Sequence, residues 1–244
     1  MKNLVIIPTY NEKDNIEAII NVTLPLHPKF EILVVDDNSP DGTAQIVKNL
    51  MSKYQDRLHI LERKKKEGLG PAYIAGFKWA IERKYDLISE MDADFSHPPE
   101  KLLDMHKVCA EEGYDMAIGS RYITGVNVVD WPIGRVIMSY YASAYVRFIT
   151  GMNIKDTTAG FVTYRRSVLE TIGLDNIKMK GYGFQIEMKF KAWKYGFKIK
   201  EVPIIFIDRK NGASKMTGGI FNEAFWGVIG MKIRSWFEKY EKVK

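Results

Sequence analysis

The stretch VVDDNSPDGT, residues 34–43, joins the end of an apolar run to a turn and to the start of an amphipathic segment. Its NSPDG part has the residue types that form turns, and Asp41 or Thr43 can cap the helix that follows. Turn and cap chemistry does not account for the two carboxylates before it, Asp36 and Asp37. This acidic pair marks the loop as a candidate site.

Short apolar runs alternate with amphipathic segments on both sides of that stretch. The runs are residues 4–7, 32–35, 58–61, 87–91 and 116–118. This rhythm predicts βαβ units and an α/β fold with a mostly parallel central sheet flanked by helices. In such sheets ligands bind beyond the carboxyl ends of the strands. We therefore expect the loops that follow the first, second and fourth runs to meet at one edge; they contain PTYNE (residues 8–12), residues 36–43 and Asp92-Ala93-Asp94.

The composition is that of an ordinary globular protein. The chain has 244 residues, of which 46% are hydrophobic and 27% charged. We expect one domain over residues 1–215 and a C-terminal amphipathic helix over residues 216–244. A net charge of +6 and a pI near 9.1 favour an acidic partner. Nucleic acid, anionic lipid and a phosphorylated substrate all fit this charge.

The chain lacks the signals of export or membrane insertion. We expect no signal peptide, because the first apolar run begins at Leu4 and is predicted to be a strand. No stretch reaches the roughly 18 uninterrupted apolar residues of a membrane-spanning helix. The single cysteine, Cys109, is expected to be a helix core residue in a reducing compartment. These features predict a cytoplasmic location.

Asp92 and Asp94 are the strongest candidates for a metal site. Two carboxylates at i and i+2 after a buried strand repel each other unless a cation lies beside them, and Mg²⁺ or Mn²⁺ prefers such oxygen ligands. The alternative is an acidic cluster at a helix N-terminus, because Pro98-Pro99-Glu100 soon begins a helix. The pattern alone is short, and its weight comes from its place at a strand end.

Basic residues that could meet a phosphate follow later in the chain. Arg121 comes directly after the fifth run, and Arg209 and Lys215 flank a segment with Gly212 and Ser214. Arginine offers a fork of donors to phosphate oxygens, and lysine offers a mobile point charge. The alternative is that these residues are part of a basic surface and bind no phosphate.

Other familiar sites are absent or weak. The glycines at residues 68, 70 and 76 lack dinucleotide-binding spacing, and no P-loop motif occurs. The run from Arg63 to Glu67 is expected to be a solvated loop, with phosphate attraction as the lesser alternative. The histidines lack metal-ligand spacing, although His97 stands beside the acidic pair; they are His27, His59, His97 and His106.

Two segments have apolar residues at helical spacing, near residues 133–149 and 220–240. Such a stripe usually packs against a core. The second segment also carries aromatic residues and, at its far end, lysines and arginines, which a helix at a membrane surface requires. Core packing and a contact with a membrane surface or a membrane-protein partner are equally supported.

These motifs together resemble the family 2 glycosyltransferases of GT-A fold, and among them the polyprenyl-phosphate (dolichyl-phosphate) mannose synthases. The resemblance runs from about Leu4 to Lys215 and includes WPIGR (residues 131–135) and GYGFQIEM (residues 181–188). It implies an enzyme that takes mannose from GDP-mannose. Many such proteins have C-terminal transmembrane helices; this chain is similar to members that have the catalytic domain alone and associate peripherally with the cytoplasmic face of the membrane.

The resemblance also implies roles for individual residues. The positions implied around the guanosine are Pro8, Tyr10, Glu12, Val35 and Asp37. Those implied for the diphosphate and its Mg²⁺ or Mn²⁺ are Asp92, Ala93 and Asp94, with Asp92 and Asp94 as metal ligands and, with Arg121, as catalytic residues. Those implied around the phosphates and the sugar are Arg121, Arg209 and Lys215; those for the acceptor phosphate are Arg121, Arg135 and Ser139. Where some members have a glutamine as a further metal ligand, this chain has Ser96.

The expected reaction is a direct displacement with inversion at the anomeric carbon. The acceptor phosphate is already an anion and needs no strong general base. One rival has the same chemistry with UDP-glucose and undecaprenyl phosphate. A second is a non-catalytic basic module for a membrane surface or nucleic acid, which leaves Glu12, Asp37 and the Asp92/Asp94 pair without a purpose; we expect no nucleic acid partner. A third, a nucleotidyltransferase, requires a Gly-rich basic loop after the first strand, which PTYNE is not.

Overall fold

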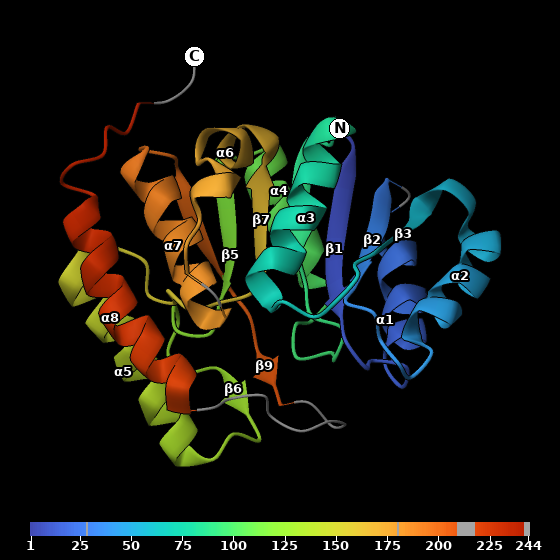
Figure 1. The fold of residues 1–244 in the computed structure, drawn as a ribbon, viewed down its shortest axis with the longest axis horizontal. Helices are drawn as coiled ribbons and strands as arrows, with labels where there is room; N and C mark the ends of the chain where they lie inside the picture. The colour runs from blue at the N-terminus through green and yellow to red at the C-terminus, as the bar shows by residue number, and fades with distance from the viewer. Residues whose placement is uncertain (28, 180, 209–217, 242–244) are drawn as a thin grey trace.

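A seven-stranded sheet with the order β3-β2-β1-β4-β7-β5-β8 forms the centre of the protein (Figure 1). The computed structural model describes residues 1–27, 29–179, 181–208 and 218–241. The strands are β1 (Asn3–Thr9), β2 (Phe30–Asp36), β3 (Leu58–Glu62), β4 (Leu87–Glu90), β5 (Met116–Ser120), β7 (Val162–Arg165) and β8 (Ile199–Pro203). Strand β7 runs antiparallel to both of its neighbours, and every other neighbouring pair is parallel. The predicted mostly parallel sheet is confirmed.

The carboxyl ends of β1, β2, β4 and β5 lie at one edge of this sheet. β1 is parallel to β2 and to β4, and the antiparallel β7 between β4 and β5 gives those two strands the same direction. In Figure 1 the N-terminus is at the top of β1, so this edge is the lower one. A small parallel sheet of β6 (Val128–Val129) and β9 (Phe206–Ile207) lies there too. The loops that the sequence pattern singled out therefore meet as predicted.

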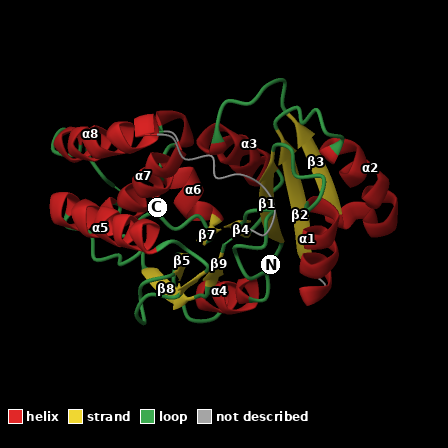
Figure 2. Ribbon diagram, turned by 90° about the horizontal axis from the view of Figure 1, so that it is seen from below, coloured by secondary structure: helices red, strands yellow, loops and turns green. Residues whose placement is uncertain are grey.

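Helices cover both faces of the sheet (Figure 2). Because successive strand residues point to opposite faces, Val5 and Ile7 pack on one side, with α1 (Ile16–Thr23), α2 (Thr43–Tyr54) and α4 (Lys101–Ala110). Leu4 and Ile6 pack on the other side, with α3 (Leu69–Glu82), α6 (Arg166–Thr171) and α7 (Gly181–Lys194). Short 3₁₀ helices span Leu24–Leu26, Gln55–Arg57 and Leu174–Asn176.

Gly76 and Cys109, both noted in the sequence, lie in the core. A Cβ at Gly76 of α3 would lie 2.9 Å from Cγ2 of Ile6, so the glycine permits close packing of this helix on the sheet. Cys109 is fully buried in α4, as expected of a helix core residue. Burial raises the pKa of the Cys109 thiol to about 12, which keeps the group protonated and unreactive.

Helices α5 (Ile133–Thr150) and α8 (Gly218–Arg234) lie side by side beyond the sheet edge (Figure 1). The Tyr145 hydroxyl of α5 donates to the Phe225 carbonyl at 2.9 Å, and the two rings stack at 4.6 Å. Val228 and Met231 of α8 join the main core. Among the described residues, no helix combines the length and apolar composition that a membrane crossing requires.

Helix α8 ends earlier than the pattern near residues 220–240 suggested. After Arg234, the amides of Trp236 and Phe237 donate to carbonyls only three residues back, those of Ile233 and Arg234, at 3.1 and 2.9 Å. This tighter turn is a common way for an α-helix to terminate. The predicted division between residues 215 and 216 stays a prediction, since residues 209–217 lie outside the described part.

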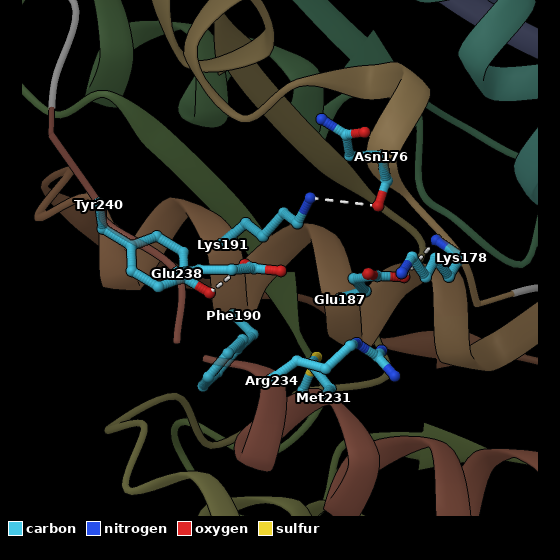
Figure 3. Close-up of a pocket in the computed structure, with 9 residues that line it drawn as sticks. All are labelled: Asn176, Lys178, Glu187, Phe190, Lys191, Met231, Arg234, Glu238 and Tyr240. Carbon is cyan, nitrogen blue, oxygen red and sulfur yellow. Dashed lines mark hydrogen bonds between the residues drawn. The ribbon is translucent and has the colours of Figure 1, made fainter. Parts of the chain in front are cut away.

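A small polar pocket joins the end of α8 to α7 (Figure 3). The buried Lys191 donates to the carbonyl oxygens of Asn176 at 3.3 Å and Ile172 at 3.4 Å, and burial lowers its pKa. Glu187 Oε2 accepts the Lys178 amide at 2.9 Å. Arg234 of α8 lines the same pocket. Side chains of α7 and of the end of α8 therefore line one pocket.

Candidate active site

Asp36 joins the loops that follow β1 and β2. Its side chain is buried, and Oδ1 accepts hydrogen bonds from the hydroxyls of Thr9 at 2.8 Å and Ser39 at 2.6 Å. Oδ2 accepts the Ser39 amide at 2.9 Å. The carboxylate at Asp36 therefore organises the loop, and its neighbour Asp37 is the member of the acidic pair that remains for a ligand.

Asp41 and Thr43 bond to each other at the start of α2, but the N-cap residue is Gly42, with no side-chain cap hydrogen bond, so neither is the predicted cap. Asp41 Oδ1 accepts the Thr43 amide at 3.0 Å and the Thr43 hydroxyl at 2.6 Å. The residue between them, Gly42, has φ of 90°, a left-handed conformation that glycine adopts without strain. The Thr43 hydroxyl oxygen accepts the Glu12 amide at 3.0 Å, so Thr43 also holds the loop after β1 in place.

Asp37 lies in a nearly buried ion pair with Arg63. Arg63 Nη1 is 2.9 Å from Asp37 Oδ1, and Nη2 is 2.6 Å from Glu67 Oε2. Burial raises the pKa of Asp37, and the Arg63 charge opposes this rise. Arg63 is thus tied to Asp37, while residues 64–67 are exposed, as the prediction of a solvated loop requires. Nothing local signalled the contact, because the partners lie 26 positions apart.

The other positions expected around a nucleoside lie on the same two strand ends. Pro8 and Val35 are partners in the β1–β2 ladder. Glu12 Oε2 accepts the side-chain amide of Asn15 at 2.9 Å. The Lys66 ammonium lies 4.1 Å from the ring centroid of Tyr10. The loops after β1 and β2 thus present an aromatic ring and carboxylates beside a basic segment.

Residues 92–97, which we call the acidic loop, form a tight turn after β4. The Asp92 amide donates to His97 Nδ1 at 3.1 Å, so the proton of a neutral His97 ring is on Nε2. The amide and hydroxyl of Ser96 both donate to Asp94 Oδ1, at 3.1 and 2.6 Å. Ser96 therefore orients the carboxylate of Asp94, and His97 holds the backbone at Asp92.

The residues of the acidic loop fit a hard divalent cation. The Asp92 side chain is 38% exposed, and Asp92 and Asp94 are carboxylates on one short turn. Burial raises the pKa of Tyr73, and the negative charges of Asp92 and Glu90 raise it further, which shows how acidic this edge is. Oxygen ligands of this kind suit Mg²⁺ or Mn²⁺, with the remaining ligands supplied by water and phosphate.

Arg121 lies at the carboxyl end of β5, with its guanidinium bound to Asp156. Nε is 2.7 Å from Asp156 Oδ2 and Nη2 is 2.6 Å from Oδ1, while the Arg121 amide donates to Oδ2 at 2.9 Å. Burial raises the pKa of Asp156, but the Arg121 charge and hydrogen bonds outweigh this effect and lower the pKa. Asp156 was missed in the sequence because its partner is 35 positions away.

The ring of Phe206 in β9 connects Arg121 to the acidic loop. Its centroid lies 5.6 Å from that of His97 and 5.6 Å from the Arg121 guanidinium carbon. The site therefore has an acidic side and a basic side that share an aromatic neighbour. Such an arrangement can bind a phosphate group together with a divalent cation.

Arg135 and Ser139 of α5 connect to the same region. Arg135 Nη1 is 2.8 Å from Asp208 Oδ2, and its guanidinium carbon is 4.0 Å from the Trp131 ring centroid. The Tyr122 hydroxyl donates to Ser139 Oγ at 2.8 Å. Tyr122, the residue next to Arg121, thus contacts α5. The predicted site residues Arg209 and Lys215 lie outside the described residues.

Comparison with known proteins gives a consistent family. Residues 4–173 match the family model described as Glycosyl transferase family 2. The chain is 46% identical over 234 residues to the polyprenol monophosphomannose synthase of Mycolicibacterium smegmatis, covering 94% of this chain and 88% of that protein. It is 44% identical over 233 residues to the undecaprenyl-phosphate mannosyltransferase of Micrococcus luteus, covering 93% and 95%.

The fold is also found among solved structures. Glucosyl-3-phosphoglycerate synthase from Mycobacterium tuberculosis, with Mn²⁺, UDP and glucosyl-3-phosphoglycerate, superimposes with a TM-score of 0.67 at 16% identity, covering 96% of this chain and 79% of that one. The same enzyme with Mg²⁺ and UDP gives a TM-score of 0.66 at 17% identity, covering 96% and 78%. These likenesses confirm the GT-A type of fold. By sequence and by fold, the chain belongs to glycosyl transferase family 2.

Proposed function

We propose that this enzyme transfers mannose from GDP-mannose to the phosphate of a polyprenyl (dolichyl-type) monophosphate, giving polyprenyl-phosphate mannose. The observation that carries the proposal is the 46% identity to a polyprenol monophosphomannose synthase over 94% of the chain. The 44% identity to an undecaprenyl-phosphate mannosyltransferase supports it. Both relatives are named for mannose and for a polyprenyl phosphate.

The donor in this proposal binds at the carboxyl ends of β1, β2 and β4. The guanosine lies in the loops after β1 and β2, beside Pro8, Tyr10, Glu12, Val35 and Asp37. Asp37 supports this assignment because Arg63 holds one of its oxygens at 2.9 Å in a nearly buried position. A carboxylate fixed in this way can accept hydrogen bonds from a base or a ribose with little loss of entropy.

The displacement itself requires positioning and charge neutralisation. An oxygen of the acceptor phosphate bonds to the anomeric carbon, the bond from that carbon to the diphosphate breaks, and its electron pair leaves with GDP, so the configuration inverts. Asp92 and Asp94, with Ala93 between them, would hold Mg²⁺ or Mn²⁺, which stabilises the charge on the departing diphosphate. Structures of the same fold with Mn²⁺ or Mg²⁺ and UDP support the use of such an ion.

Basic residues complete the proposed site. Arg121, Arg209 and Lys215 contribute positive charge around the phosphates and the sugar. Arg121 with Arg135 and Ser139 meets the acceptor phosphate. The Tyr122 to Ser139 hydrogen bond of 2.8 Å supports this grouping, because it holds α5 against the end of β5.

GDP-mannose should stabilise the protein against heat far more than UDP-glucose does. With Mn²⁺ and a donor concentration about 100 times its dissociation constant, linkage adds about 3 kcal/mol to the free energy of unfolding. Differential scanning fluorimetry measures this stabilisation. Radiolabelled GDP-mannose with polyprenyl phosphate should then give labelled lipid. Label transfer from UDP-glucose to undecaprenyl phosphate, with none from GDP-mannose, would establish the rival donor.

We also propose that the enzyme lies on the membrane surface, where its lipid acceptor is found. Exposed apolar side chains of α5 and of the segment after α8 support this contact: Ile133 is 79% exposed, Phe148 85% and Phe237 84%. Trp236 is likewise exposed, and Lys239 adds a positive charge that anionic lipid attracts. A membrane-protein partner is the competing explanation for the same surface.

The double variant Trp236→Ser/Phe237→Ser should float with liposomes about tenfold less than wild type, because it removes two exposed aromatic side chains. Flotation with vesicles of one anionic and one neutral lipid measures the effect. Val22→Ser is the matched control, since Val22 is 47% exposed on α1. These substitutions are preferable to truncation before Ile220, which would remove the buried Val228 and Met231. Wild-type protein that stays unbound in all vesicles would favour a protein partner.

A further inference from the structure

A buried polar bridge joins the end of β4 to α7. Its members are Glu90 of β4 and Gln185 and Lys189 of α7, whose exposed fractions are 0%, 1% and 0%. Gln185 Nε2 donates to Glu90 Oε2 at 2.7 Å. Lys189 Nζ donates to the carbonyl oxygen and to Oε1 of Gln185, both at 3.2 Å. We call these three residues the buried bridge.

Lys189 extends the bridge to the segment that holds Arg121. Its Nζ donates to the carbonyl oxygen of Ala159 at 2.6 Å, in the stretch between Asp156 and β7. Burial lowers the pKa of Lys189 to about 8, against the charges of Glu90 and Asp156, which raise it. Lys189 therefore links Gln185, which binds Glu90 next to the acidic loop, to the segment next to Asp156.

Stability alone does not explain why this chain buries such groups. Taking a carboxyl group and an amine out of water is unfavourable whenever they are charged, and apolar residues of similar volume are often as stable or more stable. The bridge does, however, lie next to two parts of the active site. Glu90 lies two residues before Asp92 of the acidic loop, and Lys189 bonds to the segment that continues from Asp156.

We propose that Glu90, Gln185 and Lys189 are positioning residues that fix the acidic loop relative to the Asp156–Arg121 pair. The bridge thereby holds the acidic loop, which would bind the metal, and Arg121, which would bind phosphate, at a fixed separation. The side chains are buried and act through these neighbours, without touching the donor. The inference rests on the proposed function for the identity of the donor.

The double variant Glu90→Met/Lys189→Met removes both buried ionisable groups at similar volume. We expect its Tm to stay within about 4 °C of wild type. Its kcat for mannosyl transfer should fall about 10- to 100-fold because the catalytic groups are misplaced, while KM for polyprenyl phosphate is unchanged. Titration calorimetry with Mn²⁺ in the presence of GDP should show about tenfold weaker binding.

The control is Thr163→Val, which breaks another buried polar contact of β4, in this case with β7. Thr163 Oγ1 lies 2.8 Å from Ser89 Oγ, and Ser89 points to the sheet face opposite to Glu90. This variant should lose thermal stability and keep the wild-type kcat and Mn²⁺ affinity. A second test, Glu90→Gln/Lys189→Gln, retains hydrogen-bonding groups and should recover part of the lost kcat.

The outcomes distinguish failure of the positioning role from failure of the proposed function. Wild-type kcat and Mn²⁺ affinity in a folded Met double variant would overturn the positioning role, and failure of both variants to fold would show that the bridge is only structural. If wild-type protein makes no lipid-linked mannose, the proposed function fails. The Mn²⁺ titration, repeated with UDP in place of GDP, then still decides whether the bridge shapes the metal site.

Discussion

Asp94→Asn should lower the turnover number for mannosyl transfer by about 10²- to 10³-fold, the loss expected when a stabilising contact to a departing anion is removed. The amide is neutral and binds a hard cation poorly, while its oxygen can still accept the hydrogen bonds that Ser96 donates to Asp94 Oδ1. The turn should therefore keep its shape. Initial rates over a range of Mn²⁺ concentrations measure the effect.

Ser96→Ala separates orientation of the carboxylate from metal binding by the carboxylate itself. It removes the hydroxyl that lies 2.6 Å from Asp94 Oδ1 and leaves the charge in place. We expect a loss of about tenfold, the low end for one hydrogen bond to a charged group. An Asp94→Asn enzyme with the wild-type rate at low Mn²⁺ would show that Asp94 is not a metal ligand.

The parts of the site that the sequence predicted share one property: they are local. Asp92 and Asp94 follow a single apolar run, and Asp41 and Thr43 lie within one turn, so residue order alone places them. Parallel strands then bring their loops to one edge without further information. The predicted fold was correct for the same reason.

The parts that were missed depend on contacts between distant segments. Strand β7 inserts antiparallel between β4 and β5, which no periodicity within its four residues can show. Arg63 resembled part of a solvated basic run until the fold placed it beside Asp37. Lys189 lies in an ordinary-looking helical segment, and only the tertiary structure shows that it is fully buried. Charged residues with buried partners are thus the hardest to interpret from one sequence.

Asp156→Ala should lower the free energy of unfolding by about 3–5 kcal/mol, because it leaves the guanidinium of Arg121 buried without its partner. The Arg121 side chain is 9% exposed and that of Asp156 is 0% exposed, so water cannot replace the carboxylate. For a domain of this size the loss corresponds to a Tm lower by about 10 °C or more. Urea unfolding at neutral pH measures the change.

The more exposed pair Arg135–Asp208 provides the control for stability. Its side chains are 21% and 25% exposed at a separation of 2.8 Å, so Asp208→Asn should cost only about 1 kcal/mol. Equal losses in the Asp156 and Asp208 variants would mean that burial does not set the strength of the Arg121 pair.

The pH dependence gives an independent test of the Asp156–Arg121 pair. Burial opposes ionisation of Asp156, but Arg121 outweighs it and holds the pKa in the folded state below the ordinary 3.8. The unfolded chain therefore binds the proton first, so the stabilisation is complete above pH 3.8 and is lost as the pH falls through the folded-state pKa. Wild-type protein should lose stability in this acid range more steeply than Asp156→Ala, in which the group is missing. If the free energy of unfolding of the two proteins has the same slope below pH 4, the pair is not ionised. A steeper slope for wild-type protein would mean that Asp156, which holds Arg121, accounts for part of the acid sensitivity of the enzyme.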